Sequence, residues 1–265
     1  MKNVLLLVHD DPGQEARLQV ALDLTRALGG HLTCVDVTVP IVVIGDLYGT
    51  TEQATLLQIE REKEARNKAA IEQRLANEDV SWTWLDQTDT VSDAVLDAAM
   101  LADVIVLNRK LDSTRHPDML DIASRVVMRA RKPVVAVPEA YRQLALDRAL
   151  VAWDGQAPCA TTLRACVPLL ALAKEVEIFM VGESSDRTDP AEAAEYLSRH
   201  GVHAEVRVIA PNDEPADARI AEECDRWQAD YVVMGAYGRG RLMETFGGVT
   251  KRLLATSKVP LILGH

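Results

Sequence analysis

The chain has 265 residues, of which 48% are hydrophobic and 26% charged, and its formal net charge is −11. At roughly 150 residues per domain, this length predicts about two domains. The balance of apolar and charged residues is that of an ordinary globular protein. Both parts are acidic, at −7 and −4 when the chain is divided after Asp147, which argues against a general nucleic-acid-binding surface.

The hydropathy pattern argues against a membrane protein. No apolar run approaches the roughly 18 residues that a membrane span requires. The apolar core of residues 1–8 is too short for a signal peptide and continues directly into His9 and Asp10. We therefore expect a cytoplasmic protein whose first apolar run is a buried strand.

The sequence contains an internal repeat. Residues 102–107 resemble residues 229–234 at an offset of 127. Near the start the offset is larger, because residues 4–10 match residues 148–154 at an offset of 144, which aligns Asp10 with Asp154. The chain is therefore expected to hold two copies of one fold.

The difference between the two offsets predicts an insertion in the first copy, at about residues 39–61. Its apolar start is expected to form a flap on the sheet edge or on the other copy, and a lid over a ligand is an alternative. The predicted domains are residues 1–145, which include this insertion, and residues 146–265.

Each copy alternates short apolar runs with helical patterns. The apolar runs are rich in Val, Ile and Leu, which is typical of strands buried on both faces of a parallel sheet. The expected strands are residues 4–8, 31–37, 80–85, 103–107, 133–137, 148–153, 175–181, 202–209, 230–235 and 259–263. The expected helices are residues 13–29, 52–77, 90–101, 119–131, 158–173, 189–200, 214–228 and 248–256. This α/β alternation predicts two tandem doubly wound, mainly parallel five-stranded sheets.

A glycine-rich stretch follows the fourth strand of the second copy, at the sheet edge where open α/β sheets bind ligands. Residues 235–250 contain five of the 14 glycines. Free amides near Gly248, Val249 and Thr250, where a helix begins, could bind a phosphate, and Arg239 adds positive charge. The same composition also suits a flexible surface turn, and both interpretations stay open.

The familiar nucleotide fingerprints are not met, because G-x-x-x-x-G-K-[ST] is absent and Met243 stands where the third glycine of G-x-G-x-x-G would be. Residues 230–254 instead resemble the signature of universal stress protein domains, whose loop reads G-x2-G-x9-G followed by Ser or Thr. Gly235, Gly238 and Gly248 satisfy that spacing. The duplication resembles the tandem-domain members of the family, so the resemblance covers nearly the whole chain.

This resemblance implies an adenine nucleotide alpha hydrolase-like fold and an adenine-nucleotide site in the second copy, for ATP or AMP, with or without Mg²⁺ and with no other metal. The implied site residues are Asp154 at the ribose or adenine, Val181 and Met234 at the adenine, and Gly235, Gly238, Arg239, Gly248, Val249 and Thr250 at the phosphates. It also implies that the two copies pack through their last strands about a pseudo-twofold axis.

Some of these residues also have plain structural interpretations. Asp154 could be a turn residue before a helix, and Val181 and Met234 could be core residues. Val249 departs from the family pattern because it stands at the hydroxyl position. Thr250 follows it, but its direction on a helix differs by about 100°.

The first copy lacks the same pattern. At the offset of 127, Asn108, Leu111 and Asp121 stand in place of the three glycines. Asp118 and Asp121 would also repel a phosphate at the start of the next helix. The sequence therefore predicts one nucleotide site per chain.

The expected function is that of a stress-response or regulatory protein that binds an adenine nucleotide, associates into a homodimer or other homo-oligomer, and acts on an unidentified protein partner. A weak ATPase is one alternative. Glu244 and Asp154 could supply carboxylates, although no lysine or second aspartate has a recognisable catalytic spacing. The other alternative is a dimerising scaffold, or a binder of a small apolar ligand between the copies, which the apolar insertion and Val249 favour.

Overall fold

The computed structural model describes residues 1–39, 50–108, 119–182, 188–211, 213–236 and 248–265. The strands are β1 (Asn3–Val8), β2 (His31–Thr38), β3 (Ser81–Thr88), β4 (Val104–Asn108), β5 (Val134–Val137), β6 (Arg148–Ala152), β7 (Glu175–Val181), β8 (Ala204–Ile209), β9 (Tyr231–Gly235) and β10 (Leu261–Gly264). The helices are α1 (Gln14–Leu28), α2 (Thr50–Leu75), α3 (Val91–Ala98), the short 3-10 helix η1 (Ala99–Leu101), α4 (Met119–Ala130), α5 (Ala157–Leu170), α6 (Pro190–Arg199), α7 (Ala216–Trp227) and α8 (Gly248–Thr256).

The strands form a single ten-stranded sheet in the order β3-β2-β1-β4-β5-β10-β9-β6-β7-β8. Each half of the chain contributes five strands, and the pairs within each half are parallel. The predicted α/β class with doubly wound, mainly parallel strands is confirmed, whereas the two predicted five-stranded sheets are joined into a single sheet. Every predicted strand and helix lies within three residues of the observed one at both ends, with α3 and η1 together filling the predicted helix at 90–101.

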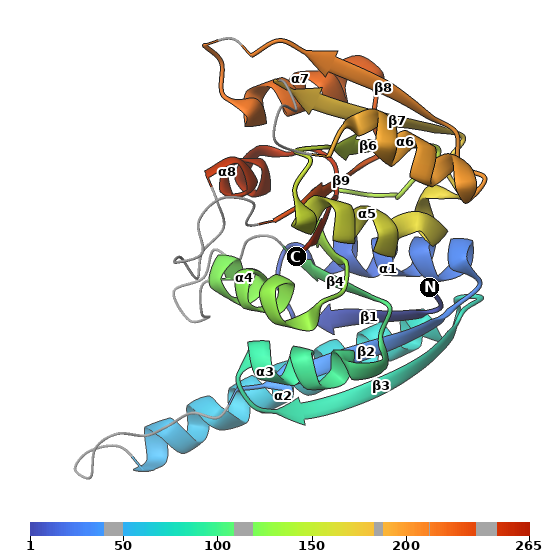
Figure 1. The fold of residues 1–265 in the computed structure, drawn as a ribbon. Helices are drawn as coiled ribbons and strands as arrows, with labels where there is room; N and C mark the ends of the chain where they lie inside the picture. Colours follow the sequence, from blue (N-terminus) through green and yellow to red (C-terminus); the bar gives the residue numbers. More distant parts are fainter. Residues whose placement is uncertain (40–49, 109–118, 183–187, 212, 237–247) are drawn as a thin grey trace.

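The two halves join through their last strands. β5 and β10 are antiparallel, with Ile262 opposite Val135. The predicted packing through the last strands is therefore confirmed, and it makes one continuous sheet out of the two predicted sheets (Figure 1). The predicted boundary between residues 145 and 146 lies in the connection from β5 to β6, and the division into domains stays a prediction.

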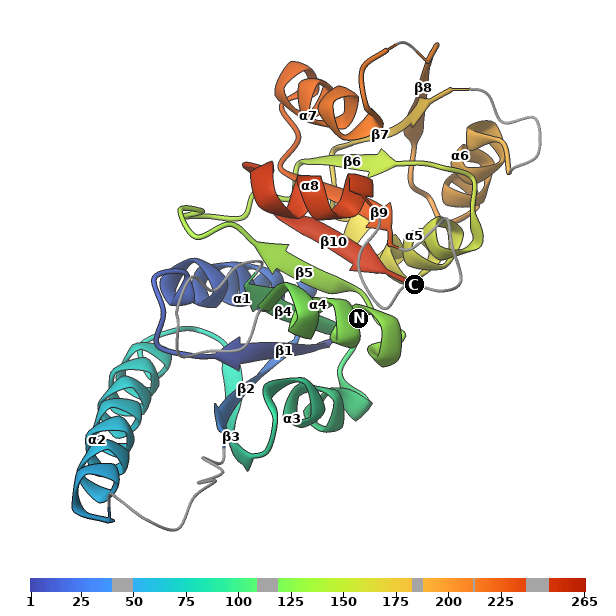
Figure 2. The same ribbon diagram turned by 90° about the vertical axis from the view of Figure 1, so that its left-hand side faces the viewer.

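Helices cover both faces of the sheet (Figure 2). One apolar core lies on the face of α1, α2, α5 and α6 and includes Leu6, Leu22 and Leu163. The other lies on the face of α3, α4, α7 and α8 and includes Leu107, Val126 and Leu253. Because successive side chains of a strand point to opposite faces, each central strand contributes to both cores.

The prediction of burial on both faces is wrong for the two edge strands. Side chains of β3 are exposed or half-buried along its length, and in β8 Val206 and Val208 are 41% and 51% exposed. An edge strand has a neighbouring strand on one side only, so its side chains have fewer packing partners than those of a central strand. Apolar character alone did not distinguish an edge strand from a central one.

The first half differs from the second in the segment between its second and third strands. Residues 39–80 separate β2 from β3, whereas residues 182–203 separate β7 from β8. Of the predicted insertion at 39–61, residues 40–49 lie outside the described residues, and from Thr50 onward it forms the start of α2. This long helix extends away from the sheet beyond β3 (Figures 1 and 2).

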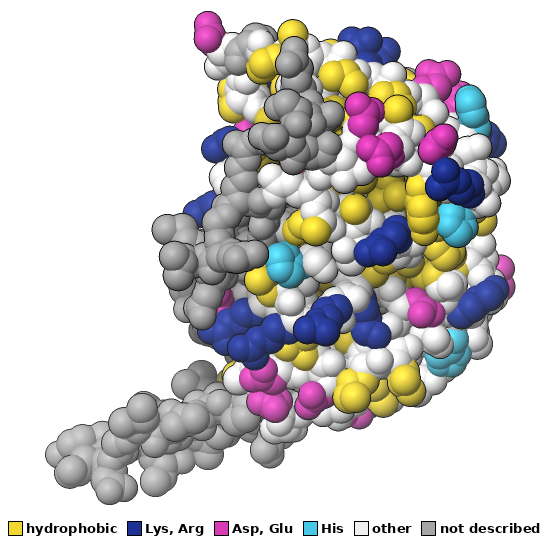
Figure 3. Space-filling model, in the orientation of Figure 1, with side chains coloured by type: hydrophobic (Ala, Val, Ile, Leu, Met, Phe, Trp, Pro, Cys, Tyr) yellow, Lys and Arg dark blue, Asp and Glu magenta, His cyan; other side chains and the backbone are white. Residues whose placement is uncertain are grey.

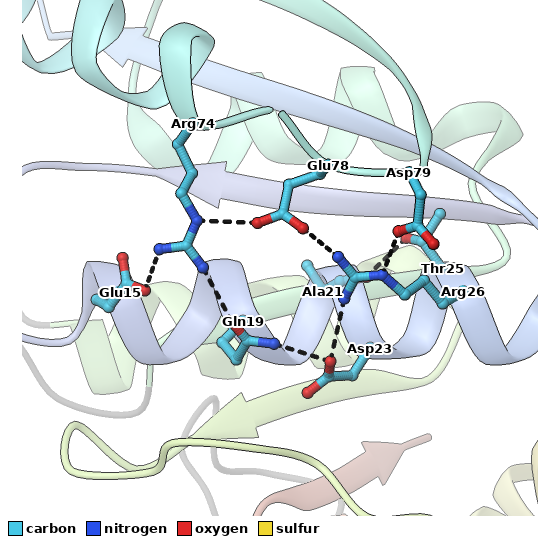
Figure 4. Close-up of polar contacts among 9 residues, drawn as sticks. All are labelled: Glu15, Gln19, Ala21, Asp23, Thr25, Arg26, Arg74, Glu78 and Asp79. Carbon is cyan, nitrogen blue, oxygen red and sulfur yellow. Dashed lines mark hydrogen bonds and ion pairs between the residues drawn. The ribbon is translucent and has the colours of Figure 1, made fainter. Parts of the chain in front are cut away.

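The end of α2 is attached to α1 by charged side chains (Figure 4). Arg74 donates from Nη1 to Glu15 at 2.6 Å and from Nε to Glu78 at 3.0 Å. Glu78 also pairs with Arg26 of α1, which donates from Nε to Asp79 at 2.5 Å. This network fixes α2 by its C-terminal end.

Among the described residues, none of the helices combines the length and the apolar character that crossing a membrane requires. Basic and acidic side chains both occur across the face seen in Figure 3, with apolar patches between them.

Candidate functional site

Four of the predicted site residues meet at the carboxyl edge of the second half. β6 pairs with β9, with Ala152 opposite Met234, and on its other side β6 pairs with β7. Asp154 and Gly235 therefore follow neighbouring strands, and Val181 ends the strand on the other side of β6. Parallel strands that end together leave their loops at one edge, which is where ligands of such sheets bind.

Asp154 holds the turn between β6 and α5. Its Oδ1 accepts the amide of Gln156 at 3.0 Å, and Gly155 has a left-handed φ of 70° that suits glycine. The Asp154 side chain is half-buried. One carboxylate oxygen of Asp154 therefore has the structural role expected of a turn residue. This bond fixes the side chain at the carboxyl ends of the strands.

Gly235 is required by packing. A Cβ atom at this position would lie 2.5 Å from the nitrogen and 2.8 Å from the Cα of Cys159, in the first turn of α5. Glycine thus allows α5 to cross the end of β9 at close range. The proposed role at the phosphates is not needed to explain this residue.

Met234 and Val181 belong to the core on the α7 and α8 face. Met234 is buried among that cluster, and Val181 is half-buried and packs against it. Met234 is therefore fully explained as a core residue. Val181 is explained as one only in part, because part of its surface is exposed at the carboxyl ends of the strands.

The start of α8 is described from Gly248 onward, while Gly238 and Arg239 lie outside the described residues. The Gly248 backbone is exposed, Val249 is half-buried against the core, and Thr250 is buried. Because the Thr250 side chain is buried, it does not present a hydroxyl at the exposed start of the helix in place of the one that Val249 lacks.

Arg252 is a candidate residue that sequence analysis missed. A Cβ on Gly248 would lie 3.1 Å from its Nη1, so the guanidinium sits beside the first turn of α8. Its Nη2 donates to Asp217 in the first turn of α7 at 2.5 Å, and this bond lowers the pKa of the Asp217 carboxyl. The available signal was the spacing of four from Gly248, which places both residues on one helix face.

The structure corrects the alignment of the first strands. Asp103 and Asp230, related by the offset of 127, accept the amides of Asn3 and Arg148 respectively, each at 2.8 Å. Likewise Val4 pairs with Val104 as Ala149 pairs with Tyr231. The offset at these strands is thus 145 rather than 144.

The counterpart of Asp154 is therefore His9, and Asp10 corresponds to Gly155. The alternation of burial explains the error, because Val8 and Trp153 face the same core, whereas matching the two aspartates would reverse the faces. The first half has no aspartate at the position of Asp154.

Charged side chains of the first half neutralise one another at the same edge. Arg17, 1% exposed, donates to both carboxylate oxygens of Asp11, at 2.9 and 2.6 Å. Asp10 pairs with Lys63 of α2 at 2.9 Å. Asp10 and Asp11, which follow β1, are thus each paired with a basic side chain of the first half.

Residues 161–264 match the family model described as the universal stress protein family. The fold of a universal stress protein from Archaeoglobus fulgidus DSM 4304 is similar over 99% of this chain and 97% of its own, at 16% identity and a TM-score of 0.73. A functionally unknown protein from Pseudomonas aeruginosa PAO1 is similar over 100% and 92%, at 16% identity and a TM-score of 0.58. At these identities the likeness shows the fold alone.

A universal stress protein family protein from Arabidopsis thaliana with AMP bound matches 44% of this chain and 90% of its own, at 13% identity and a TM-score of 0.31. A likeness at that level says nothing about the ligand of this chain. No curated protein matches the chain.

Proposed function

We propose that the second half of the chain, in which residues 161–264 match the universal stress protein family model, binds an adenine nucleotide, ATP or AMP, at the carboxyl ends of β6 and β9. Asp154 would contact the ribose or adenine, and Val181 would line the adenine side. The phosphates would bind the loop of Gly238 and Arg239 and the first turn of α8.

One observation carries this proposal. The Asp154 turn and the end of β9 lie side by side, and the helix after β9 begins at Gly248, which is exposed. The first amides of a helix have no acceptor within the helix itself. Such amides, with the helix dipole behind them, bind phosphate. The spacing from Gly235 through Gly238 to Gly248 fits the phosphate loop of the family.

The proposal limits binding to one site per chain. In the first half the position of Gly248 is taken by Asp121, whose carboxylate pairs with Arg125 at 3.1 Å. A carboxylate at the first turn of a helix repels a phosphate. It also occupies the positive end of the helix dipole, where the phosphate would otherwise bind. The buried pair of Arg17 and Asp11 supports the same conclusion for the neighbouring turn.

The proposed biological role is regulatory. Nucleotide binding would change the surface that the chain presents to a protein partner or to a second copy during a stress response, with Mg²⁺ accompanying ATP. Sedimentation of the chain with and without ATP measures whether the ligand changes its association, and equal sedimentation under both conditions would contradict a role for the nucleotide in association.

The test is a calorimetric titration of the full chain with ATP and with AMP. Wild-type protein is expected to bind at one site per chain, and Gly238→Val is expected to abolish binding without unfolding the chain, because a branched Cβ blocks access to the backbone. Leu111→Val, at the same loop position of the first half, is the matched control. Absence of binding to the wild-type chain would refute the proposal.

A second pair of variants tests the role of Asp154. Asp154→Ala is expected to weaken binding, whereas Asp10→Ala is expected to leave it unchanged because Asp10 pairs with Lys63 outside the site. Equal effects of the two variants would contradict the assignment. Steady release of phosphate from ATP would establish the weak ATPase as the better description.

A further inference from the structure

Arg252 occupies an electrostatically unfavourable place. Its guanidinium lies 3.1 Å from where a Cβ of Gly248 would be, beside the first turn of α8, and its side chain is about half exposed. The start of a helix carries the positive end of the helix dipole, which favours anions and disfavours cations. A cation held here needs a neighbouring anion.

Asp217 supplies that anion in the absence of a ligand. It stands in the first turn of α7, its side chain is 13% exposed, and its Oδ1 lies 2.5 Å from Nη2 of Arg252. The hydrogen bond from Arg252 lowers the pKa of this carboxyl, so it is ionised at neutral pH. The pair thus connects the starts of two helices at the edge where the nucleotide is proposed to bind.

In the first half the equivalent arginine has a different anionic partner. At the offset of 127, Arg125 corresponds to Arg252 and Asp121 to Gly248, and these two residues pair within α4 at 3.1 Å. There the anion is covalently part of the first turn. In the second half Gly248 has no side chain and the first turn of α8 holds no acidic residue, so the anion comes from another helix.

We infer that Arg252 binds the phosphates of the nucleotide and that Asp217 competes with those phosphates for its guanidinium, which sets the affinity of the site. This inference rests on the proposed nucleotide binding. A guanidinium forms paired hydrogen bonds with phosphate as readily as with carboxylate, so the exchange needs only a rotation of the side chain.

The inference predicts opposite effects for the two partners. Arg252→Met is expected to weaken ATP binding roughly tenfold or more, since a charge-assisted hydrogen bond is lost. Asp217→Asn is expected to strengthen ATP binding by roughly two- to fivefold, which is the scale of one surface ion pair. Neither change should alter binding of adenosine, which carries no phosphate.

The experiment is a calorimetric titration of each full-length variant with ATP and with adenosine, after thermal unfolding has shown that the variant is folded. Arg125→Met is the matched control in the first half and should bind ATP as wild type does. If Arg252→Met does not fold, Arg252→Lys keeps the charge without the paired geometry and should bind ATP more weakly than wild type.

Two results would overturn the inference while leaving nucleotide binding intact. One is wild-type ATP affinity in a folded Arg252 variant. The other is an Asp217→Asn variant that loses as much ATP affinity as Arg252→Met, because Asp217 would then position the guanidinium rather than compete for it. Failure of the proposed function is distinguishable, because it would appear as absence of ATP binding to the wild-type chain.

Discussion

Gly235→Ala tests whether this glycine serves packing. The added Cβ would lie 2.5 and 2.8 Å from the nitrogen and Cα of Cys159 and 3.0 Å from the carbonyl carbon of Pro158. All three are backbone atoms, so no change of rotamer relieves the contact, and α5 has to move away from β9. Overpacking of this kind costs about 2–3 kcal/mol. For a chain of this size we expect the melting temperature to fall by about 4–10 °C.

The measurement is thermal unfolding followed by circular dichroism, with urea unfolding as a second determination of the free energy. Gly248→Ala is the matched control, because the nearest atoms that its Cβ would meet among the described residues belong to the end of the flexible Arg252 side chain, the closest at 3.1 Å. We expect that control to change stability by less than about 0.5 kcal/mol. A Gly235→Ala protein with the same melting temperature as the wild type would refute the packing argument. If the variant lost ATP binding while its stability stayed unchanged, Gly235 would instead be assigned to the phosphate site.

Three further predictions concern stability. Tyr231→Phe should leave the free energy of unfolding unchanged or raise it by about 1 kcal/mol in urea unfolding, because the Tyr231 hydroxyl is buried and has no hydrogen-bond partner among the described residues; a clear loss would indicate a partner such as internal water. Burial, reinforced by the charges of Glu64 and Asp86, raises the pKa of Asp36 from 3.8 to about 6, so the folded chain keeps a proton that the unfolded chain releases. The contribution of Asp36 to stability should therefore fall between pH 3.8 and about pH 6, by about 1–2 kcal/mol after solvent screening, and Asp36→Asn should remove that part of the wild-type pH dependence; an unchanged profile would contradict the shift. Gly264→Ala places a Cβ 2.5 Å from Oγ1 of Thr162 and should be destabilising, and Thr162→Ala should restore part of the loss with a coupling above about 0.5 kcal/mol; strict additivity would rule out the contact.

The order and the type of the elements could be predicted from the sequence because each follows from a local pattern. Apolar runs of β-branched residues alternate with helical periodicity, and α/β alternation leaves few topologies. Joining the halves through β5 and β10 was implied by the family resemblance and not by any local pattern. The exposure of Val206 and Val208 was missed because it depends on the place of β8 at the edge of the sheet, which the local sequence pattern does not record.

The register of the first strand was missed for a different reason. Two aspartates at similar positions favoured the offset of 144, whereas the faces of Val8 and Trp153 require 145. A shift of the alignment by one residue moves every side chain of a strand to the other face of the sheet. The pattern of burial is therefore a better guide to this alignment than the identity of two aspartates. His9 rather than Asp10 is thus the residue of the first half that is equivalent to Asp154 in the second half.

The ligand interpretation of the glycine pattern depends on Gly238 and Gly248 more than on Gly235. α5 contacts β9 more extensively than α1 contacts β4, and the buried Asn108 stands in the first half where Gly235 stands in the second. A side chain is accommodated there because α1 does not press on the end of its strand in the same way. Gly235 would therefore be retained in a chain that had lost its nucleotide, whereas nothing in the packing of the described residues requires Gly248, whose Cβ would meet only Arg252. An exposed glycine beside an arginine, at the start of a helix, is the part of the pattern that the proposed ligand would explain and that the packing of the described residues does not.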